Sequence, residues 1–172
     1  MRKRDLGITL FELIVVVTII ATLMGLFMNR VLYYQELAEK VAMEEVAVAI
    51  QSALHLQFAH DAVHGKLYDA PPFVRDNPMG LLQKEPKNYA GEFYDPTPAS
   101  IAPGHWMFDL KSRDLIYVPD RTGHFIPGRD GRRWIRFHVS VRYDVVADGQ
   151  GGSRKELVAA LFEPTEPYHW LN

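Results

Sequence analysis

The most regular pattern in the chain is an unbroken apolar run near its N-terminus. Residues Ile8 to Met28 carry a single ionisable side chain, that of Glu12. A helix of these 21 residues would be roughly 31 Å long at about 1.5 Å per residue, which matches the hydrocarbon core of a bilayer. The run therefore predicts a helix that spans a membrane. A cleaved signal peptide has a shorter apolar region, and the length of the run and its lack of a polar face disfavour a buried core helix.

A second pattern, with a helical period, follows the apolar run from Asn29 to about Ala62 without proline or glycine. Apolar residues three or four apart predict a helix with one apolar face, which packs on a globular domain. Gly65 marks the expected end of this helix. The predicted face consists of Tyr34, Ala38, Val41, Ala42, Val46, Ala49, Ile50, Ala53 and Leu54, and Glu39, Lys40, Glu44, Gln51 and Ser52 lie outside it.

The C-terminal two thirds of the chain show a different pattern. The proline-rich segment 65–104 predicts a long surface loop with at most one short helix or strand. His105–Leu110 and Leu115–Pro119 flank a short polar turn and predict a hairpin. Ile135–Val145 alternates strictly between apolar and polar residues, which predicts a strand with one buried face. Leu157–Phe162 is the last expected strand.

These elements predict an α+β fold, in which a long N-terminal helix packs on an antiparallel sheet of about four strands. The first half of the helix is transmembrane. The expected divisions are a leader at 1–7, a membrane helix at 8–28, an amphipathic continuation at 29–64 and a globular domain at 65–172.

Composition and charge restrict the classes of partner and the kinds of site that this domain can have. The formal net charge is −2, yet the first seven residues hold three basic residues and one acidic residue. The rest of the chain is therefore acidic, which disfavours nucleic acid as a partner. There is no cysteine, so disulfides, thiolate metal sites and cysteine nucleophiles are excluded.

Orientation follows from the basic residues Arg2, Lys3 and Arg4 before the apolar run. By the positive-inside rule they keep the N-terminus in the cytoplasm, and the domain is translocated. Within the run, the carboxylate of Glu12 is costly in hydrocarbon, which indicates that it has a positive partner.

The leader Arg2-Lys-Arg-Asp-Leu-Gly7, followed by Ile8-Thr-Leu-Phe-Glu12 and the apolar helix, resembles the N-terminus of the type IV pilin and type II secretion pseudopilin superfamily. The resemblance covers about 25 residues. It implies that a prepilin peptidase cuts between Gly7 and Ile8 and methylates the new amine of Ile8. It also implies that Glu12 pairs with the N-terminal amine of a neighbouring subunit during assembly.

What the resemblance implies about partners and location is also specific. The expected partners are other pilin or pseudopilin subunits, the prepilin peptidase, an inner-membrane assembly platform and the lipid bilayer. The expected location is the bacterial inner membrane, with the domain in the periplasm or within a filament. Asn29 stands where many major pilins have proline, and no C-terminal cysteine pair is present; both departures favour a minor subunit.

An alternative class is a membrane-tethered binding module, which would bind DNA or a surface without a filament role. Arginines around Trp134 are a candidate stacking platform, although a solvated loop is the preferred interpretation. These arginines are Arg129, Arg132, Arg133 and Arg136.

No catalytic, metal or cofactor site is expected from the remaining motifs. His55, His60 and His64 are interpreted as a solvated helix end, because metal sites need converging ligands. Gly149–Arg154 is interpreted as a hairpin turn, since it lacks the ending of a phosphate-binding loop. Asp144 and Asp148 have too few acidic neighbours for a calcium site.

Overall fold

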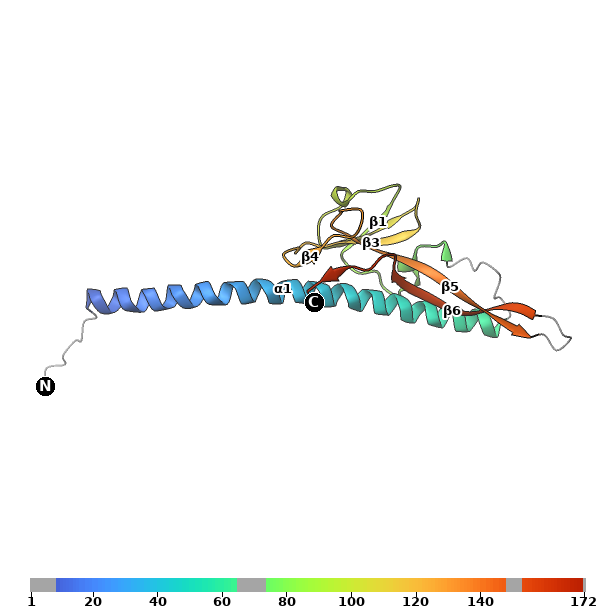
Figure 1. The fold of residues 1–172 in the computed structure, drawn as a ribbon, viewed down its shortest axis with the longest axis horizontal. Helices are drawn as coiled ribbons and strands as arrows, with labels where there is room; N and C mark the ends of the chain where they lie inside the picture. The colour runs from blue at the N-terminus through green and yellow to red at the C-terminus, as the bar shows by residue number, and fades with distance from the viewer. Residues whose placement is uncertain (1–8, 65–73, 148–152, 172) are drawn as a thin grey trace.

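The computed structural model describes residues 9–64, 74–147 and 153–171 of the chain. The one α-helix among these residues, α1 (Leu10–Val63), has 54 residues and is roughly 80 Å long at about 1.5 Å per residue. The C-terminal half of α1 lies along the sheet, and the apolar segment at its N-terminal end extends beyond the domain (Figure 1) and is not buried against it. Among the described residues, α1 is the one helix long and apolar enough to cross a membrane.

The sheet against α1 is mixed and has five strands, in the order β1-β2-β3-β5-β6. The predicted hairpin is present, with Trp106 opposite Tyr117, and the alternating segment forms one long strand. The strands are β1 (Tyr89–Phe93), β2 (His105–Asp109), β3 (Asp114–Val118), β5 (Ile135–Ala147) and β6 (Ser153–Pro164).

The prediction of about four antiparallel strands is wrong in two respects. β1 pairs with β2 in parallel, so the proline-rich segment adds an edge strand as well as the short helices η2 (Pro78–Leu81) and η3 (Pro98–Ser100). A second, two-stranded sheet joins β4 (Phe125–Ile126) to β7 (His169–Trp170). This small sheet brings the C-terminal segment back to α1 (Figure 1).

The face of the sheet toward α1 forms the main core. Trp106, Phe108, Leu115 and Phe137 are buried there with residues of the helix. The Trp106 ring lies 4.9 Å from that of Tyr117 and 5.6 Å from that of Phe137, measured between centroids. The helix contributes Met43, Ile50 and Leu54, each at most 1% exposed.

This packing corrects the predicted apolar face of the helix. Val46 packs on the core and Ile50 and Leu54 are buried in it, as expected. The other large members of the predicted face, Tyr34 and Val41, are 62% and 44% exposed. Ala38, Ala42 and Ala49 are also exposed. The buried face runs instead through Glu36, Met43, Ile50, Leu54 and the partly buried Phe58, so α1 is turned by about a third of a revolution from the predicted setting.

Gln51, which the sequence placed outside the buried face, fixes the helix to the edge of the sheet. Its amide oxygen accepts a hydrogen bond from the backbone N–H of Phe162 at 2.6 Å. Its amide nitrogen donates to the carbonyl oxygen of Ala160 at 3.0 Å. Because β6 is an edge strand, these two bonds satisfy backbone groups that a further strand would otherwise pair.

Candidate functional site

Of the predicted processing and assembly residues, Glu12 lies in the first turn of α1. Gly7 and Ile8 lie outside the described residues. Thr9 is the N-cap of the helix, and its hydroxyl oxygen accepts a hydrogen bond from the backbone N–H of Glu12 at 3.3 Å. The Glu12 side chain is exposed in the first turn, where the helix dipole favours a negative charge.

The other polar groups of the apolar segment are satisfied within the helix. The hydroxyl of Thr18 donates to the carbonyl oxygen of Ile14, and that of Thr22 donates to the carbonyl oxygen of Thr18, each at 2.8 Å. Such bonds to the preceding turn allow threonine in a lipid environment. Glu12 is therefore the polar side chain of this segment that needs a partner from outside the helix.

A second carboxylate of α1, Glu36, lies at the junction with the domain and is 4% exposed. Its Oε1 accepts hydrogen bonds from the backbone N–H of His124 and from the indole N–H of Trp170, both at 2.9 Å. Its Oε2 accepts from Nδ1 of His124 at 2.8 Å. Glu36 thus joins the helix to both strands of the small sheet, through His124 directly before β4 and Trp170 in β7.

The electrostatics of this junction keep Glu36 ionised. Burial acts to raise the pKa of Glu36, but the hydrogen bonds from His124 and Trp170 favour the charged form and hold the pKa below its usual value. Gly123 also lies close, since a Cβ at this position would come to 3.2 Å from Oε2 of Glu36. The backbone of the loop before β4 therefore packs directly against the carboxylate of Glu36.

Glu39, one turn further along α1, binds the same part of the domain. Its Oε1 accepts from the hydroxyl of Tyr117 at 2.9 Å and from the backbone N–H of Asp120 at 2.7 Å. Its Oε2 accepts from the backbone N–H of Arg121 at 2.9 Å. Burial, followed by the nearby Glu39 charge, raises the pKa of Tyr117, so its hydroxyl remains a donor.

Sequence reasoning missed Glu36 and placed Glu39 on the solvated side, because charged residues in an amphipathic helix are usually exposed. A signal was nevertheless present in the spacing of the largest apolar residues. Met43, Ile50 and Leu54 recur at intervals of seven and four, and the same face extended backward by seven reaches Glu36.

The arginines around Trp134 do not form an open stacking platform. Arg132 and Arg136 lie over the Trp134 ring at 4.9 and 5.8 Å from its centroid, and the indole N–H donates to Asp130 at 2.7 Å. Arg136 also forms an ion pair with the buried Asp114. The aromatic face is covered by the protein's own side chains.

The other candidate motifs also have ordinary local contacts. The rings of His60 and His64 lie 4.3 Å apart, and His55 contacts Gln51 at 2.7 Å. In the part of the chain that the structure describes, no group of three or more His, Asp or Glu side chains converges as metal ligands would. Asp144 accepts from the backbone N–H of Val145. Asp148 and the glycines of Gly149–Arg154 lie outside the described residues.

Comparisons with protein-family models, with curated proteins and with solved structures find no match for this chain. The long apolar N-terminal helix with a sheet packed on its second half is compatible with a pilin-like architecture. Any functional conclusion therefore depends on the residues themselves.

Replacing Glu36 by glutamine tests the junction. At neutral pH we expect the free energy of unfolding to fall by about 2 kcal/mol, because charge-assisted hydrogen bonds are lost and an amide nitrogen cannot accept from His124. Thermal or denaturant unfolding of the full chain in detergent, followed by tryptophan fluorescence, measures this loss. Glu45→Gln, at an exposed position of the same helix, should change stability by less than about 0.5 kcal/mol.

The sign of the pH dependence is part of the same test. Because folding lowers the pKa of Glu36, the carboxylate stabilises the fold above its ordinary value of about 4.5, and this contribution disappears as the pH falls through the lower, folded value. The difference between wild type and Glu36→Gln should therefore shrink in acid. A difference that stays constant down to the acid limit would contradict the assignment.

Proposed function

We propose that this chain is a membrane-anchored structural subunit of the pilin type, namely a minor pilin or pseudopilin of a type IV pilus or type II secretion filament. One observation carries the proposal: α1 leaves an apolar surface exposed along its whole length. In the membrane segment this surface surrounds the helix. Beyond it, the surface continues as a stripe on the side opposite the sheet.

The stripe is defined by Tyr34, Val41, Val48, Leu56 and Val63. Successive members are seven or eight residues apart, so they share one helix face, and they are 62%, 44%, 65%, 74% and 84% exposed. On the domain side, Met43, Ile50 and Leu54 are at most 1% exposed. Glu45 and Ser52 are exposed on the same face, which is otherwise apolar. An extended, largely apolar surface of this kind marks an interaction site, and copies or relatives of the same helix, packed side by side, would cover it.

Glu12 supplies a polar element to this apolar packing. Cleavage between Gly7 and Ile8 would place a new amine one residue before the N-cap Thr9, four residues before Glu12. An unpaired carboxylate in a medium of low dielectric costs several kcal/mol. Pairing Glu12 with the amine of a neighbouring Ile8 would remove this cost and set the axial position of each subunit.

The location proposed with this function is the inner membrane, with Ile8–Met28 spanning the bilayer and the domain in the periplasm before assembly. The partners are other pilin-type subunits, the prepilin peptidase that cuts after Gly7, and an assembly platform. The basic residues Arg2, Lys3 and Arg4 support this orientation.

Processing is tested by intact-mass measurement of the chain purified from its native membrane. We expect the mature protein to begin at Ile8 and to carry one added methyl group on its amine. Changing Gly7 to glutamate should leave the leader attached, because a bulky charged residue cannot lie extended in the peptidase site. A wild-type protein that still begins at Met1 would contradict the proposal.

Replacing Glu12 by alanine tests assembly. The processed subunit should remain in the membrane but should be recovered with filament subunits at about one tenth of the wild-type yield or less, since a loss of about 1.4 kcal/mol already corresponds to ten-fold. Glu85→Ala removes an exposed carboxylate of the domain and serves as the control. Full recovery of Glu12→Ala would favour a tethered binding module instead.

Replacing Val48 by aspartate tests the stripe. Because Val48 is 65% exposed, the monomer should keep its thermal stability within about 0.5 kcal/mol, while recovery with filament subunits should fall at least ten-fold as the charge enters an apolar contact. Val158→Asp, at a position in β6 that is 43% exposed, should assemble normally. Equal recovery of both variants would show that the stripe is not a contact surface.

A further inference from the structure

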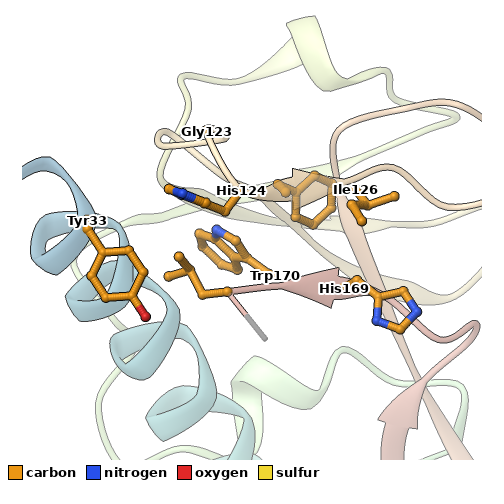
Figure 2. A pocket seen from close by; sticks show the side chains of 8 residues that line it. Tyr33, Gly123, His124, Ile126, His169 and Trp170 are labelled. Carbon is orange, nitrogen blue, oxygen red and sulfur yellow. The ribbon is translucent and has the colours of Figure 1, made fainter. Parts of the chain in front are cut away.

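A groove lies between α1 and the loop before β4, at the end of the domain nearest the apolar segment. It consists of two adjoining hollows of about 480 and 420 Å³, which share Tyr33, Gly123 and His124 as walls. The first hollow is also lined by Arg30 and Leu32 of α1. The second extends over Ile126 and Trp170 of the β4–β7 sheet (Figure 2).

The position of the groove along α1 places it at a membrane surface. Residues 29–33 follow directly on the apolar run that ends at Met28, so they lie about 2 to 8 Å beyond it at about 1.5 Å per residue. The headgroup layer of a bilayer is roughly 5 to 8 Å thick on each side. Tyr33 and Tyr34 add the aromatic side chains that prefer this layer. The lower part of the groove therefore opens among the headgroups.

The charged groups of the groove favour an anion. Arg30 is exposed, and within the described part of the chain its guanidinium has no carboxylate partner. Glu36 is the one acidic residue among the described residues that line either hollow. Both of its oxygens accept hydrogen bonds from His124 and Trp170. A cationic headgroup would therefore find no open carboxylate here.

The remaining walls are apolar and still exposed. Leu32, Tyr33 and Ile126 are 50%, 38% and 61% exposed, and the Tyr33 ring stands edge-on to that of His124 at 5.7 Å between centroids. Arg30 can therefore bind a phosphate group, and the apolar walls beyond it can contact the carbon atoms of a glycerol headgroup.

We infer that this groove binds the headgroup of one anionic glycerophospholipid of the phosphatidylglycerol type. Its phosphodiester accepts hydrogen bonds from Arg30, its glycerol headgroup lies against Leu32, Tyr33 and Ile126, and its acyl chains run back toward the apolar run that ends at Met28. The lipid would thereby join the membrane end of α1 to the domain at the same junction that Glu36 holds. This site depends on the membrane span proposed above and on no other part of the proposed function.

Native mass spectrometry of the full chain, released from detergent with added phosphatidylglycerol, tests the site. The wild type should retain one phosphatidylglycerol. Arg30→Gln should lower the lipid-bound fraction about ten-fold, because the charge-assisted contact to the phosphate is lost, and Arg30→Lys should keep most of it. Arg142→Gln changes an exposed arginine of β5 and should bind as the wild type does. Equal retention by Arg30→Gln and wild type would overturn the site.

A phosphatidylglycerol with a photoactivatable group near the glycerol provides a second, independent readout in reconstituted membranes. Labelling of both 29–36 and 121–126 is expected, because the groove is built from both segments. Labelling confined to 10–28 would mean that the lipid only surrounds the membrane helix, and equal retention of phosphatidylethanolamine would overturn the preference for an anion. Release of the chain from membranes by alkaline washing would instead contradict the membrane span. This measurement therefore distinguishes a failure of the lipid site from a failure of the proposed membrane span.

Discussion

The rotational setting of α1 about its own axis is the constraint on which the rest of this structure depends. Both sides of the second half of the helix carry apolar residues, so hydrophobic burial alone does not select the side that faces the sheet. Glu36, Glu39 and Gln51 select it, because each binds backbone groups of the domain. Turning the helix would leave these groups buried without partners, at a cost of about 1–3 kcal/mol each.

This constraint explains which features the sequence could predict. The length of the helix follows from the apolar run and from the absence of proline, and the long strand β5 follows from alternation that begins at Ile135. The β2–β3 hairpin follows from its short polar turn. These are local properties, and the structure confirms them.

The features that the sequence did not predict are those set by distant contacts. Tyr34, Ala38 and Val41 also have helical spacing, and the distant partners of Glu36 and Glu39 fix which of the two faces is buried. β4 and β7 have two residues each, too few for any periodic pattern, and they form because Trp170 is buried against α1. The parallel edge strand β1 lies in the proline-rich segment, which predicted a long loop with at most one short helix or strand and gave no sign of parallel pairing. In the predicted site, Glu12 could be identified from its surroundings in the sequence, whereas the groove at Arg30 requires the fold.

Two carboxylates of α1, those of Glu36 and Glu12, differ in where their hydrogen-bond partners come from. Glu36 is buried in the monomer, and its charge is satisfied by His124 and Trp170 from the chain's own domain. Glu12 lies 24 residues earlier, where the described structure places no part of the domain, so its partner must come from water, lipid headgroups or another subunit. The hydrogen bonds of Glu36 hold the domain against α1, and they leave the stripe of Tyr34, Val41 and Val48 facing outward. In the proposed assembly, Glu12 would offer its carboxylate to the neighbouring helix that covers that stripe. The contacts of Glu36 within the chain thus orient the stripe, the surface proposed for assembly, without any contribution from a neighbour.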